Sequence, residues 1–156
     1  MIQRIQTVFL LLATLSAGLL FVFPIAWYYG EFNTIEFMVY QLIDTVPGSQ
    51  PVYNSFFLLP LIAITLISMG LSVAVIFSYK SMNKQLRMTK LNIFLTIVLI
   101  AAIFFFYADH IGKTLNALPQ YEFGIFLPLI VLVFLILALR AIQRDLKLVR
   151  SVDRLR

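Results

Sequence analysis

The chain has 156 residues, of which 62% are hydrophobic and 12% are charged, and its mean hydropathy is +0.97. Soluble domains carry about 25% charged residues, so this composition excludes a soluble globular protein and predicts an integral membrane protein. The sequence contains no cysteine, which excludes disulfides, thiolate catalysis, iron–sulfur clusters and a lipid anchor on an N-terminal cysteine. The net charge of +5 lies beside the apolar runs, where membrane topology explains it, so nucleic acid is not an expected partner.

The first apolar run, residues 8–29, is 22 residues long and ends with Trp27, Tyr28 and Tyr29. A cleaved signal peptide has an apolar region of about 7–15 residues followed by a site with two small residues. The run is longer than this and has no convincing cleavage site. It therefore predicts a transmembrane helix with an aromatic belt at its outer end.

The segment after it, residues 30–52, contains three acids and no base. Asn33 and Glu36 have the spacing of a helix capping box, and the apolar residues after them recur with a helical period. This pattern favours a short amphipathic helix lying on the membrane surface. The alternation of Ile35, Phe37 and Val39 also fits a strand paired with the second outer loop, so both alternatives remain open.

The second apolar run, residues 53–79, is uncharged and long enough to span a bilayer with some tilt. Small residues recur four positions apart in the first two runs, and in lipid such residues let helix backbones approach closely. We expect the two helices to pack together within one chain, with a dimer face as the alternative. The residues predicted to form this contact are Ala13, Ala17, Gly18, Gly70 and Ala74.

Two further spans follow a short basic connection at residues 80–90. The third, residues 91–108, ends in an aromatic belt, and residues 109–122 form the second outer loop. The fourth, residues 123–139, continues without Gly or Pro into a tail with six Lys or Arg. An apolar stripe runs along this segment at three-four spacing, which predicts that the helix continues past the membrane. The stripe consists of Leu135, Leu139, Ile142, Leu146 and Val149.

The distribution of charge predicts the orientation. Eleven Lys or Arg fall on the side of the two termini and the middle connection, whereas Lys113 alone accompanies five acids in the outer loops. Basic residues remain on the cytoplasmic side, so both termini are expected to be cytoplasmic. We predict an all-α membrane protein, in which residues 1–156 form one four-helix, up-down transmembrane bundle with a cytoplasmic extension of the last helix.

The four predicted spans contain no Asp, Glu, Lys, Arg or His, which argues against a proton-coupled transporter and a membrane-embedded hydrolase. Asp109 and His110 suggest a polar cluster at a helix end, with a weak metal site as the alternative. We expect no catalytic, cofactor-binding or metal-binding residues. Three prolines near the outer helix ends either splay the bundle into a shallow cavity or are tolerated there; these are Pro24, Pro60 and Pro128.

The basic residues are the candidate docking site. Juxtamembrane bases attract anionic lipid, and the tail contains more of them than orientation alone requires. Anchoring to anionic headgroups and docking onto an acidic surface of a membrane-protein partner are both plausible. The residues are Lys80, Lys84, Arg87, Lys90, Arg140, Arg144, Lys147, Arg150, Arg154 and Arg156.

Several motifs resemble a known family. They are residues 1–7, MIQRIQT; residues 77–80, FSYK; residues 83–88, NKQLRM; residues 90–92, KLN; residues 126–129, FLPL; residues 138–144, ALRAIQR; and residues 149–156, VRSVDRLR. These resemble domain-of-unknown-function family 4293, small four-span proteins of Bacteroidota. The resemblance covers nearly the whole chain, is weakest in the outer loops, and implies a bacterial inner-membrane location but no activity.

The expected function is that of a non-catalytic accessory or scaffolding subunit of a larger inner-membrane complex. Translocation, insertion or respiratory machinery are possible hosts. The expectation depends on the lack of charged groups inside the spans and on the surplus of basic residues on the cytoplasmic side. The alternative is an oligomeric channel or carrier for lipid or a small neutral solute.

Overall fold

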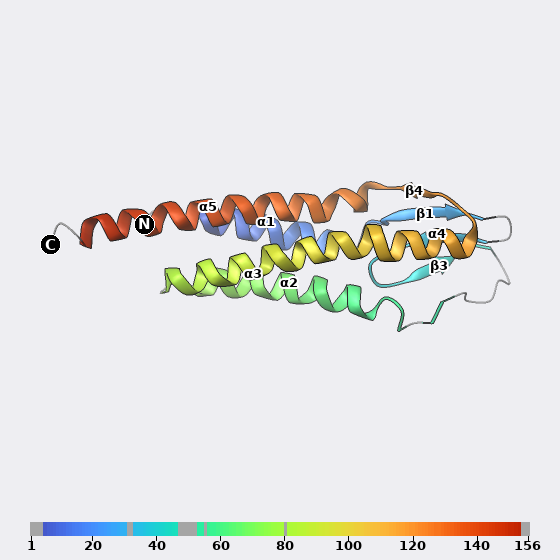
Figure 1. Ribbon diagram of the computed structural model, residues 1–156, viewed down its shortest axis with the longest axis horizontal. Coiled ribbons are helices and arrows are strands. Elements are labelled where there is room, and N and C mark those ends of the chain that lie inside the picture. The colour runs from blue at the N-terminus through green and yellow to red at the C-terminus, as the bar shows by residue number, and fades with distance from the viewer. Residues whose placement is uncertain (1–4, 31–32, 47–52, 55, 80, 154–156) are drawn as a thin grey trace.

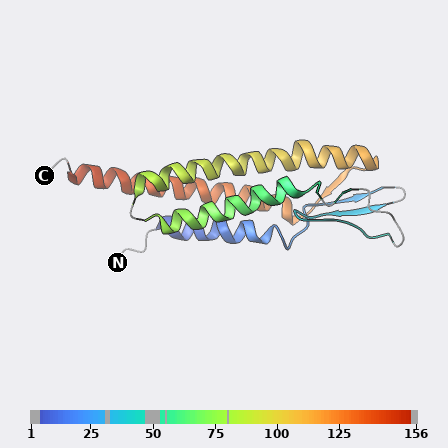
Figure 2. The same cartoon turned by 90° about the horizontal axis from the view of Figure 1, so that it is seen from below.

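The computed structural model describes residues 5–30, 33–46, 53–54, 56–79 and 81–153, with side chains as far as Val149. Within these residues the chain forms a bundle of four helical rods with a small antiparallel sheet at one end (Figure 1). Neighbouring rods run in opposite directions. The start of α1, the turn between α2 and α3 and the end of α5 all lie at the end of the bundle opposite the sheet (Figures 1 and 2).

The four rods differ in length. The first, α1, spans Ile5–Leu19, and α2 spans Leu59–Phe77. The third is continuous from α3 (Met82–Ala101) through a π-helical segment (Ala102–Ala108) into α4 (Asp109–Leu115). The fourth begins as a 3₁₀ turn (Phe123–Phe126) and continues as α5 (Leu127–Asp153). At 1.5 Å per residue, the third rod is about 50 Å long and α1 only about 22 Å.

Three of the rods are long and apolar enough to cross a membrane: Leu59–Phe77, Met82–Leu115 and Phe123–Val149. At 15 residues, α1 is a shorter apolar helix. Large apolar side chains on the rods face outward, and the buried positions include many small or polar residues. A soluble bundle has the opposite arrangement, so the surface of this one indicates membrane association.

The interior follows a heptad spacing on three rods. Buried positions alternate three and four residues apart on α1, α2 and α3, which is the period that keeps one face of a helix against its neighbours. On α5 the spacing is similar, and its buried residues pack with those of α1 along the bundle axis. The axial side chains of this cluster are Leu10, Ala13, Ala17, Val75, Val131, Leu135, Ala138 and Ile142.

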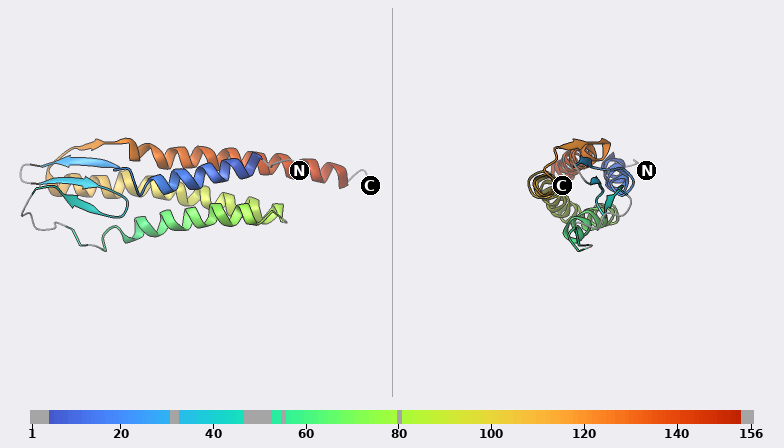
Figure 3. Two further views of the ribbon diagram at one scale, coloured as in Figure 1. Left: turned by 180° about the vertical axis from the view of Figure 1, so that it is seen from behind. Right: turned by 90° about the vertical axis from the view of Figure 1, so that its right-hand side faces the viewer.

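The sheet has the strand order β3-β2-β1-β4, with all neighbours antiparallel. β1 (Ala26–Tyr29) lies between β2 (Thr34–Phe37) and β4 (Pro119–Tyr121), and β3 (Leu42–Asp44) forms the far edge. One face packs its alternate residues, including those at positions 28, 35 and 37, into a cluster with the π-helical segment and α4. The sheet therefore lies alongside α4, against the last part of the third rod (Figure 3).

The structure corrects the prediction for the first outer segment. Residues 34–37 form a strand, so the amphipathic surface helix is wrong, and with it the all-α prediction at this end of the molecule. The alternative of a strand is correct, but its predicted pairing is not, because β2 pairs with β1 and β3 and not with the second outer loop. The first helix ends at Leu19, and the last residues of the predicted span form β1. The strand alternation prevails because β1 offers a hydrogen-bonding partner to β2, whereas an isolated short amphipathic helix has none. The second outer loop joins the sheet through β1.

The three prolines lie at or beyond the ends of helices, and none lies in a helix interior where it would bend the helix. Pro24 lies between α1 and β1, Pro60 occupies the first turn of α2, and Pro128 occupies the first turn of α5. Proline lacks only an N–H that would be unpaired in the first turn, so it is compatible with these positions. The prolines therefore do not splay the rods, and the alternative of tolerated end positions is correct.

Two helices are longer than their predicted spans. The basic connection predicted at residues 80–90 is mostly helical, since α3 begins at Met82, and Lys80 lies outside the described residues. The outer loop at 109–122 begins with α4. The predicted continuation of the fourth helix into the tail is confirmed, because α5 extends to Asp153.

The predicted contact of small residues is only partly present. Ala13 and Ala17 are buried, and a Cβ added to Gly18 would lie 3.7 Å from Met69 Cε of α2. The prediction for Gly70 is wrong: it lies on the outer face of α2, and an added Cβ would meet nothing within 4 Å. α2 instead turns its serines inward, and Ala74 is half-buried.

Candidate functional site

A seam of uncharged polar side chains joins α2 to α3 inside the bundle. Asn92 lies at its centre and is completely buried. Its Nδ2 donates to Ser72 Oγ at 2.7 Å and to the Ser68 carbonyl at 3.1 Å, and its Oδ1 accepts from Ser68 Oγ at 2.7 Å. Hydrogen bonds of this kind hold helices together in lipid, where apolar contacts alone give little preference.

The seam extends toward the α2–α3 turn through Gln85. Its Nε2 donates to the Val75 carbonyl at 2.9 Å. The hydroxyls of Thr65, Thr89 and Thr96 each donate to the carbonyl four residues earlier in their own helix, so these buried groups are satisfied locally. The seam carries no charge and joins two helices, and the buried Gln85 Oε1 is the atom in it that has no hydrogen-bond partner among the described residues.

The sequence contained a signal for this seam that the search for ionisable groups missed. Polar residues occupy positions 65, 68 and 72 of the second apolar run, positions 85 and 89 of the basic connection, and positions 92 and 96 of the third run. These intervals of three and four match the inward-facing positions of both helices. Counting uncharged polar residues on a helical period would have found the contact.

The end of the bundle opposite the sheet has a basic surface. It comprises the exposed side chains on α3 and α5, two rods in contact. Its basic residues, all members of the predicted docking set, are Lys84, Arg87, Lys90, Arg140, Arg144 and Lys147. Among the side chains that the structure describes at this end, one acid, Asp145, lies with them. The side chain of Arg150 and all of Arg154 and Arg156 lie outside the description.

A cavity of about 430 Å³ opens at this end between the first turns of α1 and the middle of α5. Phe9 and Leu137 form part of its apolar wall, and Arg140, Arg144 and Asp145 form part of its polar wall. Gln6 also lines it and is only 2% exposed, yet its Oε1 has no hydrogen-bond partner. No sequence pattern joined residues 6 and 145, because only the packing of α1 on α5 brings them together.

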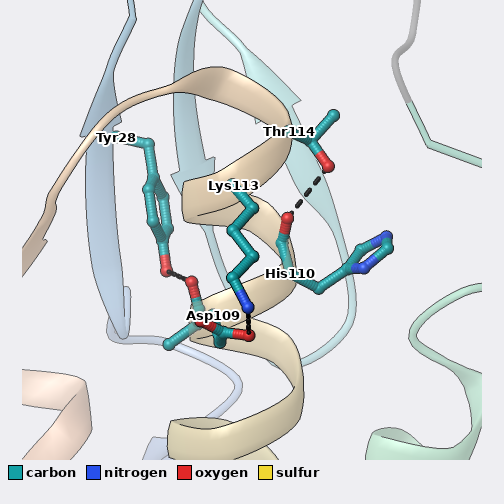
Figure 4. A network of polar contacts seen from close by, with 6 residues as sticks. Tyr28, Asp109, His110, Lys113 and Thr114 are labelled. Atoms are coloured by element: carbon teal, nitrogen blue, oxygen red, sulfur yellow. Dashed lines mark hydrogen bonds and ion pairs between the residues drawn. The ribbon is translucent and has the colours of Figure 1, made fainter.

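The predicted Asp109–His110 pair does not converge on one point. Lys113 Nζ forms an exposed ion pair with Asp109 Oδ2 at 2.7 Å, one helical turn away. The imidazole of His110 points away from that carboxylate (Figure 4) and stacks on Phe106 with ring centroids 6.2 Å apart. Within the described residues, no three groups of the metal-ligating kind gather. The predicted polar cluster at a helix end is therefore wrong, because the two side chains point apart and the third rod continues past them to Leu115.

Tyr28 attaches the sheet to the third rod. Its hydroxyl donates to the Ala108 carbonyl at 3.3 Å, and burial, followed by the nearby Tyr121 and Tyr53, raises the pKa of this phenol (Figure 4). The phenol therefore stays protonated and keeps its donor. A cavity of about 510 Å³ lies beside this attachment, between α4 and β4, and contains the Asp109–Lys113 ion pair.

The described side chains thus form a basic surface at one end of the bundle and line two cavities. The family described as "Domain of unknown function (DUF4293)" matches residues 2–155. The chain belongs to this family. Comparisons with curated proteins and with solved structures gave no match.

Proposed function

We propose that this DUF4293 protein is a non-catalytic accessory or scaffolding subunit of a larger inner-membrane protein complex. Its four rods cross the membrane, with both termini in the cytoplasm and the sheet on the outer side. The eleven Lys or Arg on the side of the termini, against one among the outer loops, support this orientation. α1 is short for a span, so local thinning of the bilayer accommodates it.

The basic surface is the observation that carries the proposal. Six exposed cationic side chains lie on two contacting rods at the cytoplasmic end, where they can face an acidic partner. Such a surface steers association and selects partners by charge. Anionic headgroups offer a second ligand for the same cations.

The packed interior supports a scaffold over a carrier. Apolar side chains fill the axis between α1, α2 and α5, and Asn92 at the centre of the polar seam is hydrogen-bonded to Ser68 and Ser72. The prolines lie in first turns and between elements, which removes the outward splaying on which the carrier hypothesis depended. A channel or carrier would therefore need several copies of the chain.

Co-purification from native membranes tests the proposal. One variant lacks residues 144–156, and it keeps Ile142, the last fully buried residue described on α5, so the bundle should remain inserted. A second, Arg87→Gln/Lys90→Gln, removes charge from α3 alone. We expect both to lose the proteins that the intact chain retains in neutral detergent, as identified by mass spectrometry.

The matched control is Lys113→Gln, which removes an exposed cation at the sheet end and should leave the retained set unchanged. Reporter fusions must show that all variants keep the orientation of the intact chain. Retention of the same proteins by both variants would show that the docking surface lies outside the basic end. Solute movement by the purified chain alone in liposomes would contradict the subunit hypothesis.

A further inference from the structure

The cavity between α1 and α5 has polar groups of both signs that do not satisfy one another. Arg140 and Arg144 lie one helical turn apart on the same side of α5. Asp145 lines the same cavity and is half-buried, but among the described side chains its carboxylate takes part in no ion pair. Two cations and one anion are thus presented separately to whatever occupies the cavity.

Gln6 adds an acceptor without a donor. Its side chain is 2% exposed and Oε1 has no partner, although a buried amide oxygen normally accepts a hydrogen bond. A buried acceptor without a partner destabilises the folded chain, so a resident ligand with a donor would remove that cost. An anion would not, because it also is an acceptor.

The position of the cavity limits the kind of ligand. It lies where the apolar part of α5 ends at Leu139 and the basic tail begins at Arg140, the level expected of lipid headgroups. Phe9 and Leu137 provide an apolar wall on the side of the bilayer core. Its volume of about 430 Å³ lies in the range of small-molecule sites, about 300–1,000 Å³.

We propose that this cavity binds the headgroup of phosphatidylethanolamine. The guanidinium groups of Arg140 and Arg144 donate to the phosphate, and the primary ammonium donates to the Asp145 carboxylate and to Gln6 Oε1. A headgroup with phosphate and ammonium a few bonds apart matches the two signs of the cavity. The site shares Arg140 and Arg144 with the basic surface, whereas Gln6 belongs to the cavity alone, so a Gln6 variant tests the lipid site separately from the proposed role as a subunit.

Two common headgroups lack one half of this match. Phosphatidylglycerol has the phosphate and two hydroxyl donors but no cation, so it leaves the charge of Asp145 unmatched. Phosphatidylcholine has the same charges as phosphatidylethanolamine, but its quaternary ammonium has no N–H to donate to Gln6 Oε1. Comparing the three lipids therefore separates attraction of anions by the basic surface from recognition by the cavity.

Native mass spectrometry of the purified full-length chain, titrated with the three lipids carrying identical acyl chains, tests the assignment. We expect phosphatidylethanolamine to bind about tenfold more tightly than phosphatidylcholine, which is the effect of one charge-assisted hydrogen bond. Gln6→Leu and Asp145→Asn should each remove most of this preference. Arg140→Gln/Arg144→Gln should weaken the binding of all three lipids.

The matched control is Gln143→Leu, an exposed position of α5 that does not line the cavity, and it should keep the preference. Should Gln6→Leu fail to fold, Asp145→Asn at a half-buried position provides the same comparison. Equal binding of phosphatidylethanolamine and phosphatidylcholine would overturn the assignment, as would tighter binding of phosphatidylglycerol. Gln6→Leu should still retain the protein partners, so this result does not depend on the subunit hypothesis.

Discussion

Single residues decide how closely the chain segments at the sheet end approach. Gly124 is buried in the 3₁₀ turn before α5, and its N–H donates to the Pro24 carbonyl at 3.0 Å. A Cβ at this position would lie 2.3 Å from that carbonyl oxygen and 2.9 Å from the oxygen of Phe23. The entry to β1 and the start of the fourth rod are therefore held in contact at a glycine.

Replacing this glycine should be costly. Gly124→Ala forces the backbone of residues 23 and 24 away, so we expect the free energy of unfolding to fall by about 1–3 kcal/mol, the usual range for overpacking. Gly70→Ala is the control, because open space surrounds it and alanine favours a helix interior over glycine by up to about 1 kcal/mol. Thermal unfolding in detergent should show opposite shifts, and equal shifts would contradict the packing at Gly124.

At the level of elements, the contact between α2 and α3 depends on the side-chain amide of Asn92. Asn92→Ala removes the group that joins Ser68 and Ser72 to α3, so we expect a loss of about 1–2 kcal/mol, typical of hydrogen bonds between membrane helices. Asn83→Ala, an exposed position of the same helix, should change little. The readout is unfolding of purified protein by denaturing detergent.

A double-mutant cycle separates the hydrogen bonds from the loss of volume. If Asn92 acts through Ser68, then Ser68→Ala should cost less in the Asn92→Ala background than in the intact chain. Strictly additive effects would show that the two side chains are merely neighbours.

The elements also show how far sequence reasoning reaches. Helix-forming runs are long and uninterrupted, so the rods and the extension of α5 past Leu139 could be predicted from local pattern. Residues 26–29 belong to an uncharged run in which a strand and the end of a helix look alike, because the deciding partner at 119–121 is far along the chain. Among the candidate site residues, the cations could be predicted from charge alone. The cavity could not, since Gln6 and Asp145 meet only through packing.

For the whole molecule, the orientation in the membrane is the prediction with the broadest consequence. Reporter fusions after Lys84 and at Arg156 should give a cytoplasmic signal, and fusions at Ser49 and Asn116 an external one. The excess of basic residues on one side is the physical reason. A cytoplasmic signal at Ser49 would contradict four crossings, and it would indicate that the short α1 does not span the bilayer.

The pairing of β1 with β4 has a consequence for the order in which the protein is made. β2 follows β1 within a few residues and can pair at once, but β4 begins about 90 residues later in the chain. At the usual rate of synthesis, roughly 5–20 residues per second, β1 has one edge unpaired for roughly 5–20 s. During this interval α2 and the whole third rod are produced. The last hydrogen bonds of the sheet therefore form only in a nascent chain whose first three helices already exist, so closure of the sheet marks the late stage of assembly.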